Sequence, residues 1–227
     1  MNKLFKFFAL ALFPSLLTAG CSKQEQGSAN NSVVDEWQMN IVRQQISQLP
    51  FQQLSTEEIN SLMQMREEEK LARDVYKTLY AKWGSRVFSN ISASEQNHMD
   101  AVLALIKKYN LTDPVPSDEV GVFKSEEMQK LYRQLTEQGF KSIVDAYKVG
   151  ATIEDLDLYD LMKAFSFVDN EDVRAVYTNL SRGSRNHLRA FYSNIVSLGA
   201  VYVPLYLTAA EFDAVINSEM ERGGWRN

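Results

Sequence analysis

Several side chains that can bind metal ions are spaced along the chain at helical intervals. Glu95 and His98 are three residues apart, and so are Glu154 and Asp157. Residues three apart lie about one turn apart on the same side of a helix, so each pair would present two ligands together. Carboxylate oxygens and imidazole nitrogens are ligands that iron accepts. With two isolated residues added, the candidate metal ligands are Glu69, Glu95, His98, Glu154, Asp157 and His187.

These residues interrupt apolar rows that recur at spacings of three and four, the pattern of a helix face turned towards a bundle core. In the first long predicted helix, Glu69 stands in such a row. Its neighbours in the row are Leu62, Met65, Ala72, Tyr76 and Leu79. The rows of the other long helices are interrupted in the same way, each near the middle of its helix. Antiparallel packing would therefore bring the polar groups to one depth.

Compensating cations would be needed at that depth. A carboxylate taken out of water without a partner costs on the order of several kcal/mol. Two divalent ions would balance the four candidate carboxylates, with neutral His98 and His187 as nitrogen ligands. The sequence therefore predicts a site for a pair of metal ions inside a helical bundle.

The composition favours the helices that such a bundle requires. The chain has 10 glycines and 5 prolines among 227 residues, and most of it lacks the alternating pattern of strands. Ser55-Thr56-Glu57-Glu58 fits a capping box, and Asp169 is expected to cap the last long helix. The predicted helices are 55–82, 89–109, 125–138, 141–164, 170–198 and 209–217.

The lengths of the connections predict how the long helices are arranged. A few residues join the first long helix to the second and the third to the fourth, whereas residues 110–140 separate the second from the third. Two antiparallel hairpins with one long crossover are the connectivity of ferritin-like bundles. We therefore expect an all-α fold, a ferritin-like four-helix bundle whose long crossover connection contains a short helix.

The amino terminus has the pattern of an export signal. Lys3 and Lys6 precede an apolar run that is too short to span a bilayer, and small residues follow it. Leu17-Thr18-Ala19-Gly20-Cys21 resembles a bacterial lipobox, which implies an acylated Cys21 as the first mature residue and attachment to a lipid membrane. Ser22 after the cysteine points to the outer membrane, facing the periplasm. An ordinary secretory signal with a chance cysteine is the alternative.

Four regions follow from these patterns. We predict a lipoprotein-type signal peptide at 1–20, a polar tether at 21–54, a ferritin-like bundle at 55–200 and a C-terminal extension with a short helix at 201–227. The tether is rich in Gln, Asn and Ser, a composition that favours a linker.

Charge and cysteine content exclude several classes of function. The formal net charge is −5 at pH 7, and nucleic-acid binding requires a basic face. We therefore expect no nucleic-acid partner. The single cysteine excludes an intrachain disulfide and a zinc site built from several cysteines.

The motifs in combination resemble known di-iron proteins. Glu69 is followed seven residues later by Tyr76, and E-x-x-H, E-x-x-D and S-x-x-H segments follow along the chain, as in ferritin, bacterioferritin and rubrerythrin. Residues 67–76 and 183–191 resemble more closely the prokaryotic ferritin-like domain of unknown function 2202, and the resemblance covers about 55–200. Asn-His-(Met/Leu)-x-Ala recurs around both histidines, which indicates equivalent helices in a bundle with pseudo-twofold symmetry.

The resemblance also implies individual roles. Tyr76 is expected to be a phenol hydrogen-bonded to a ligand carboxylate, although a core tyrosine fits as well. Ser184 stands where many di-iron sites have a bridging glutamate, and Asp157 is a candidate to replace that ligand.

Each of these candidate residues also has a purely structural interpretation. Glu67 and Glu68 are expected to be solvated and paired with Lys70 and Arg73, and Glu69 could belong to the same charged run. Both histidines could be core residues with satisfied hydrogen bonds, and Asp157 could be part of a solvated acidic cluster. The methionines are expected to fill the core. They include Met63, Met65, Met99 and Met162.

The resemblance implies an extracytoplasmic protein with two iron ions and ferroxidase or rubrerythrin-like peroxidase activity. Manganese and zinc are alternative metals, and a homodimer is one expected assembly. A metal-free helical-bundle lipoprotein that binds a protein partner is a second hypothesis. A haem protein with His98 and His187 as axial ligands is a third.

Overall fold

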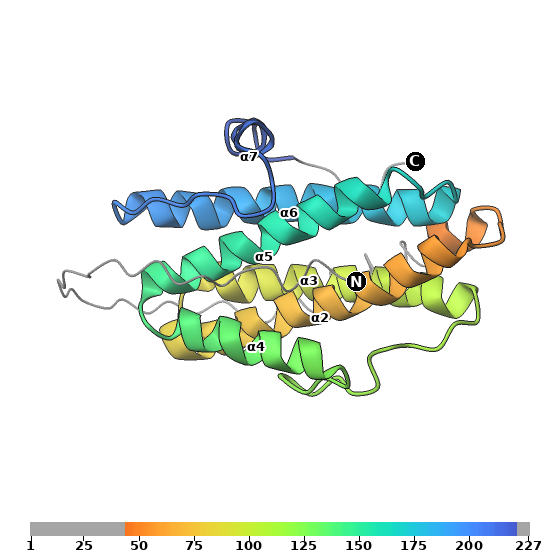
Figure 1. Ribbon diagram of the computed structural model, residues 1–227, viewed down its shortest axis with the longest axis horizontal. Helices are drawn as coiled ribbons and strands as arrows, with labels where there is room; N and C mark the ends of the chain where they lie inside the picture. The colour runs from red at the N-terminus through yellow and green to blue at the C-terminus, as the bar shows by residue number, and fades with distance from the viewer. Residues whose placement is uncertain (1–43, 222–227) are drawn as a thin grey trace.

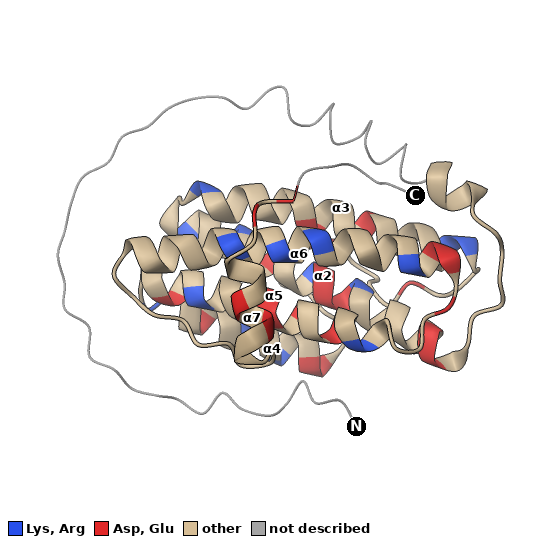
Figure 2. Ribbon diagram, turned by 90° about the horizontal axis from the view of Figure 1, so that it is seen from above, with Lys and Arg blue, Asp and Glu red and all other residues tan. Residues whose placement is uncertain are grey.

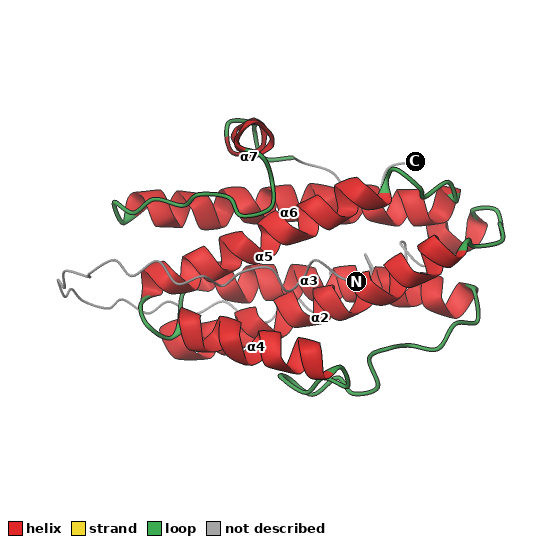
Figure 3. Ribbon diagram, in the orientation of Figure 1, coloured by secondary structure: helices red, strands yellow, loops and turns green. Residues whose placement is uncertain are grey.

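The computed structural model describes residues 44–221 of the chain. The predicted signal peptide, the acylation site at Cys21 and most of the predicted tether lie outside these residues. Within the described part, all regular secondary structure is helical and no strand is present (Figure 3). No helix in this part is both long enough and apolar enough to cross a membrane.

Four long helices make up the body of the molecule, and shorter helices flank them (Figure 1). The long helices are α2 (Thr56–Trp83), α3 (Arg86–Lys108), α5 (Ile143–Ala164) and α6 (Glu171–Ser197). The shorter helices are α4 (Glu126–Gly139) and α7 (Ala209–Ile216). Residues 44–48 are also helical. The predicted elements are confirmed, with limits that differ by up to three residues.

Local capping explains where α2 begins and ends. The Ser55 hydroxyl accepts a hydrogen bond from the Glu58 amide, and the Glu58 carboxylate accepts one from the Ser55 amide, which is the predicted capping box. Gly84 ends α2 in the left-handed conformation, with φ of 66°, where a side chain would be strained.

The predicted cap of α6 is wrong by one residue. Asn170 is the N-cap, and Asp169 lies outside the helix. The backbone amides of both residues donate to the Glu58 carboxylate, at 3.2 Å each. The start of α6 is therefore set by a carboxylate on α2, which no local pattern in the last helix could indicate.

The helices pair as two hairpins. Helix α2 packs along α3, and α5 packs along α6, while the segment that contains α4 crosses from one hairpin to the other (Figure 1). Helix α4 contacts both α2 and α5. The prediction of a four-helix bundle with one long crossover containing a short helix is thus confirmed.

Buried charges on α2 hold the crossover in place. Lys70 and Arg73 both form ion pairs with Asp74, and all three side chains are at most 1% exposed. Lys70 Nζ donates to the Glu119 carbonyl at 2.9 Å, and the Gly121 amide donates to Asp74 at 3.0 Å. We predicted that Lys70 and Arg73 pair with Glu67 and Glu68. This prediction is wrong, because the side chains of Lys70 and Arg73 face the crossover.

Glu68 corrects a second expectation, since it is 8% exposed rather than solvated. Met162 corrects a third, because it is 47% exposed and does not fill the core. Both errors concern the rotation of a helix about its axis relative to its neighbours.

Figure 2 shows Lys and Arg interspersed with Asp and Glu along the bundle.

The apolar core is divided into two clusters. One contains Leu79, Phe88 and Phe191, and the other contains Leu62, Leu105 and Leu180. In α2, α3 and α6 the predicted polar residues stand between the residues of these two clusters. The core therefore has a polar layer in its middle.

Candidate metal centre

The polar layer brings together side chains from all four long helices. Two groups of three residues each have potential ligand atoms within 4.8 Å of one another. The first group is Glu69, Glu95 and His98, and the second is Glu95, Glu154 and His187. The structure therefore places five of the six predicted ligands in one buried cluster, and Glu95 belongs to both halves.

Glu95 lies between the two imidazoles. Its Oε2 is 2.7 Å from Nδ1 of His98, and its Oε1 is 2.9 Å from Nδ1 of His187. The His98 nitrogen is also 3.2 Å from Oε2 of Glu69. On the other side, His187 Nδ1 is 3.4 Å from Oε2 of Glu154. The two rings are stacked with centroids 5.6 Å apart, so both histidines direct the same nitrogen at the shared carboxylate.

A hydrogen bond orients His187. Its Nε2 is 3.0 Å from the Ser94 hydroxyl. When Nε2 carries the proton and donates to Ser94, Nδ1 has a free lone pair for a cation. Sequence reasoning did not identify Ser94, although its position directly before the E-x-x-H segment was a usable clue.

A glycine on α6 makes room for His98. A Cβ added to Gly183 would lie 2.5 Å from Nε2 of His98. Real Cβ contacts are not this short, so any larger residue would push the imidazole away. Gly183 was also missed, and the clue was a glycine in the middle of a helix, which usually has a packing reason.

Tyr76 holds the carboxylate of the second group. Its hydroxyl donates to Oε1 of Glu154 at 2.5 Å, and the side chain is fully buried. The ring packs against Phe191 with centroids 5.2 Å apart. The predicted contact between this phenol and a candidate ligand carboxylate is therefore present in the structure.

Asp157 lies outside both ligand groups. The Ser184 hydroxyl is 2.5 Å from its Oδ2 and 2.9 Å from the Leu180 carbonyl. Burial raises the pKa of Asp157 well above its ordinary value, and the nearby Glu69 carboxylate adds to this. In this geometry Glu95, and not Asp157, is the carboxylate shared between the two groups. A metal-binding role for Asp157 stays a prediction.

Burial disfavours the ionised form of the carboxylates in the two ligand groups. It raises the pKa of Glu69 to about 8 and that of Glu154 to about 7. Burial also acts on Glu95, but the two histidines outweigh it and lower the pKa of this carboxyl. Burial lowers the pKa of His187, whereas Glu95 and Glu154 together raise it to about 10. Positive charge is thus strongly favoured at this point of the core.

Several buried atoms at the centre lack a hydrogen-bond partner among the described residues. They are Oε1 of Glu69, Oε1 of Glu95 and Nδ1 of His187. The last two atoms are 2.9 Å apart, so they form a charge contact without the geometry of a hydrogen bond. Buried polar atoms are normally satisfied, and each exception requires an explanation. A buried oxygen of Glu69 without a hydrogen-bond partner, beside this charge contact, fits a bound cation.

Comparison with known proteins places this arrangement in a family. The profile of the family described as "Uncharacterized protein domain (DUF2202)" matches residues 58–219, which include every residue of the centre. The chain belongs to the DUF2202 family. Over 178 residues it is 54% identical to the uncharacterized protein MJ0754 of Methanocaldococcus jannaschii, covering 78% of this chain and 96% of the relative.

A solved structure shows the same fold as this DUF2202 protein. The crystal structure of the hypothetical protein MJ0754 from Methanococcus jannaschii aligns with a TM-score of 0.75 and 54% identity. The alignment covers 76% of this chain and 99% of that one.

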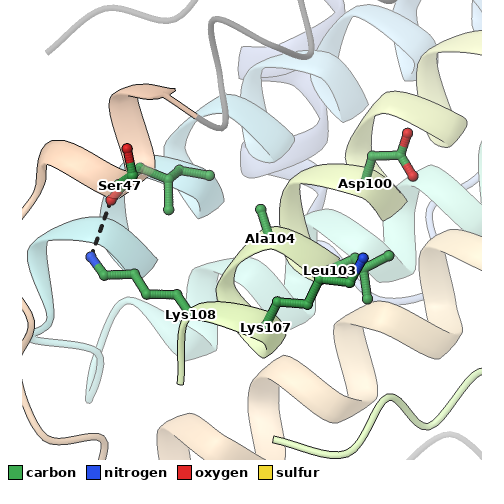
Figure 4. Close-up of a pocket in the computed structure, with 7 residues that line it drawn as sticks. Ser47, Asp100, Leu103, Ala104, Lys107 and Lys108 are labelled. Atoms are coloured by element: carbon green, nitrogen blue, oxygen red, sulfur yellow. Dashed lines mark hydrogen bonds between the residues drawn. The ribbon is translucent and has the colours of Figure 1, made fainter. Parts of the chain in front are cut away.

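A surface pocket of about 470 Å³ lies elsewhere, between α3 and the helical residues 44–48 (Figure 4). Its α3 residues, which include Asp100, Leu103 and Lys107, occupy the side of the helix opposite Glu95 and His98. The neighbouring Lys108 amine is already engaged, because it donates to carbonyls of residues 46, 49 and 50. The pocket is therefore separate from the candidate metal centre.

Proposed function

We propose that this DUF2202 protein is a ferritin-like di-iron carboxylate protein. It binds two Fe(II) ions and reacts with oxygen or peroxide, in the manner of a ferroxidase or a rubrerythrin-like peroxidase. The observation that carries the proposal is the pair of three-ligand groups that share Glu95 at the centre of the bundle. A carboxylate with one oxygen in each group is suited to bridge two ions.

The donor set suits the proposed metal. Glu69 and His98 would hold one ion, Glu154 and His187 would hold the other, and Glu95 would contact both. Mixed oxygen and imidazole ligands are typical of non-haem iron, and they also accept manganese or zinc. Two divalent ions would more than balance three buried carboxylates, so an anionic oxygen species would also be accommodated electrostatically.

Bound iron would supply the redox chemistry, and the protein would supply position and exclusion of water. Tyr76 fixes one oxygen of Glu154, and Ser94 fixes the ring of His187. The aromatic ring of Phe191 packs against Tyr76, and both side chains are fully buried. These contacts limit the directions in which the ligands can move.

The test is metal analysis of the purified protein followed by oxidation kinetics. We expect about two iron ions per chain after anaerobic loading and Fe(II) oxidation faster than in buffer. Glu69→Ala and His98→Ala should each weaken binding, because each removes a ligand of one group. Absence of bound metal at neutral pH, or binding that is unchanged in both variants, would overturn the proposal.

A metal-free bundle that binds a protein partner is the rival function. The observation in its favour is that protonated His98 and His187 could neutralise the carboxylates that they contact. The buried Oε1 of Glu69, which has no hydrogen-bond partner, weighs against it, because a retained polar network is stable only when its members are satisfied. This rival predicts an unchanged melting temperature after chelation.

Geometry also weighs against haem. The imidazoles of His98 and His187 are stacked with centroids 5.6 Å apart, and carboxylates fill the space beside them. Axial ligands of haem direct a nitrogen at each other across the iron, whereas both of these rings direct Nδ1 at Glu95. Absence of a Soret band in the purified protein would confirm the exclusion.

We further propose that Cys21 is acylated and tethers the bundle to the outer membrane, facing the periplasm. The support is the sequence of residues 1–22 alone. The mass of the mature protein tests it, because acylation adds lipid to Cys21 and Cys21→Ala should abolish the addition. A mature mass without lipid would indicate an ordinary exported protein.

Sedimentation of the same preparation tests whether the bundle forms a homodimer.

A further inference from the structure

A row of carboxylates leads away from the candidate metal centre. On α5, Asp157 and Asp160 follow Glu154 at intervals of three residues, so their side chains wind slowly along one side of the helix. On α2, Glu68 precedes Glu69 and interacts electrostatically with Asp157 and Asp160 across the packed helices. Acidic side chains over just under two turns of α5 therefore adjoin the site where α2 meets α5.

The row reaches the surface at one end. Glu154 is 2% exposed, whereas the side chain of Asp160 is 15% exposed. Lys163 pairs with Asp160 at 3.3 Å and is itself 44% exposed, so this cation lies at the solvent end. The carboxylates thus extend from the buried centre to a partly exposed residue.

Glu68 is an unexplained member of this row. It is 8% exposed, and its Oε2 is buried without a hydrogen-bond partner, while Oε1 accepts from Gln64 at 2.9 Å. The charged groups that act on it most strongly are the acids Asp160, Asp157 and Glu67. A buried carboxyl oxygen that faces other acids is costly unless the group takes up a proton or a cation joins it.

The spacing of these carboxylates would let a divalent cation pass along the row and would not hold it tightly. Among the described residues, three or more ligand atoms lie within 4.8 Å of one another only in the two groups of the candidate metal centre. Oxygens of Glu68, Asp157 and Asp160 are further apart, so they cannot enclose an ion tightly in this conformation. Acidic walls of low dielectric constant nevertheless raise the local concentration of cations.

We infer that Glu68, Asp157 and Asp160 form an uptake path along which divalent cations pass from solvent to the centre. The inference rests on the proposed function, because a path requires a destination. It assigns Glu68 and Asp160 a role in the rate of loading and none in holding the loaded ions.

Stopped-flow binding of Co(II), an air-stable probe for Fe(II), to the full metal-free protein tests the path. The variants are Glu68→Gln and Asp160→Asn, and the matched control is Glu137→Gln, which removes one charge from an exposed position on α4. We expect association and dissociation to slow by the same factor, roughly three- to tenfold, in both path variants. The dissociation constant should stay unchanged, because a path lowers the barrier in both directions.

The outcomes separate the path from the centre. Rates in both path variants that match the control would overturn the path and leave the centre intact. A weakened dissociation constant at an unchanged association rate would make these residues ligands or structural groups, which also overturns it. Wild-type protein that binds no Co(II) would overturn the proposed function and the path together. Asp160 is partly exposed, so its variant provides the test if Glu68→Gln fails to fold.

Discussion

Gly183 on α6 and His98 on α3 are in direct contact, and a Cβ on the glycine would lie 2.5 Å from Nε2 of the imidazole. Gly183→Ala should therefore move the ring away from Glu69 and Glu95. Overpacking of this kind costs about 1–3 kcal/mol of stability. A loss of metal affinity of roughly ten- to a hundredfold should accompany it. Titration with Co(II) and thermal unfolding measure the two effects.

The control for this variant is Thr178→Ala, at an exposed position on the same helix. It should leave metal affinity unchanged. Full metal affinity in Gly183→Ala would show that His98 can move without consequence, and would remove this imidazole from the centre.

Ser94→Ala should weaken metal binding without removing a ligand. The substitution deletes the hydroxyl that is 3.0 Å from Nε2 of His187, so the ring loses its orientation and its preferred tautomer. The expected loss of affinity is about tenfold or more. Ser89→Ala is the matched control, because Ser89 is on the same helix and its hydroxyl donates only to the Arg86 carbonyl. Equal affinities in the two variants would contradict the role of Ser94.

Tyr76→Phe should destabilise the folded protein and slow oxidation. The phenol donates to Glu154 at 2.5 Å in a fully buried environment, and its loss leaves that carboxylate short of a donor. Such a loss costs about 1–3 kcal/mol. Tyr192→Phe is a suitable control. Tyr192 is on α6, and its ring packs against Phe212. Iron oxidation as fast as in wild type would limit Tyr76 to a packing role.

The stabilisation that metal provides should grow as pH rises from about 5.5 to 8. Burial raises the pKa of Glu69 to about 8 and that of Glu154 to about 7, so below these values both carboxyls carry protons that a metal must displace. Without metal the folded state binds more protons than the unfolded state over this range, and its stability falls as pH rises. His187 acts in the same direction, because its pKa is raised to about 10.

Melting temperatures with and without Co(II) at several pH values measure this effect. The difference between the two curves should be small at pH 5.5 and largest near pH 8. A difference that is constant with pH would mean that the ion binds elsewhere. The variant Glu69→Gln should flatten the dependence, because it removes one displaced proton.

Local sequence determined the helices and the types of ligand. Capping residues and glycines act within a few residues, so the limits of α2 could be read from Ser55, Glu58 and Gly84. The spacing of Glu95 and His98 placed both side chains on the inner face of α3, since helical periodicity is a local property. The convergence of the ligands followed from their shared depth in the helices.

Tertiary structure alone decided the contacts between helices. Rotation of a helix by a fraction of a turn moves Glu68 from solvent to the interior, and it decides whether Asp157 meets a ligand group or Ser184. Gly183 and Ser94 acquire their roles from imidazoles on other helices, at distances that no spacing along one helix contains. The reason is physical: periodicity specifies which face is buried, whereas packing against neighbours specifies what that face contacts.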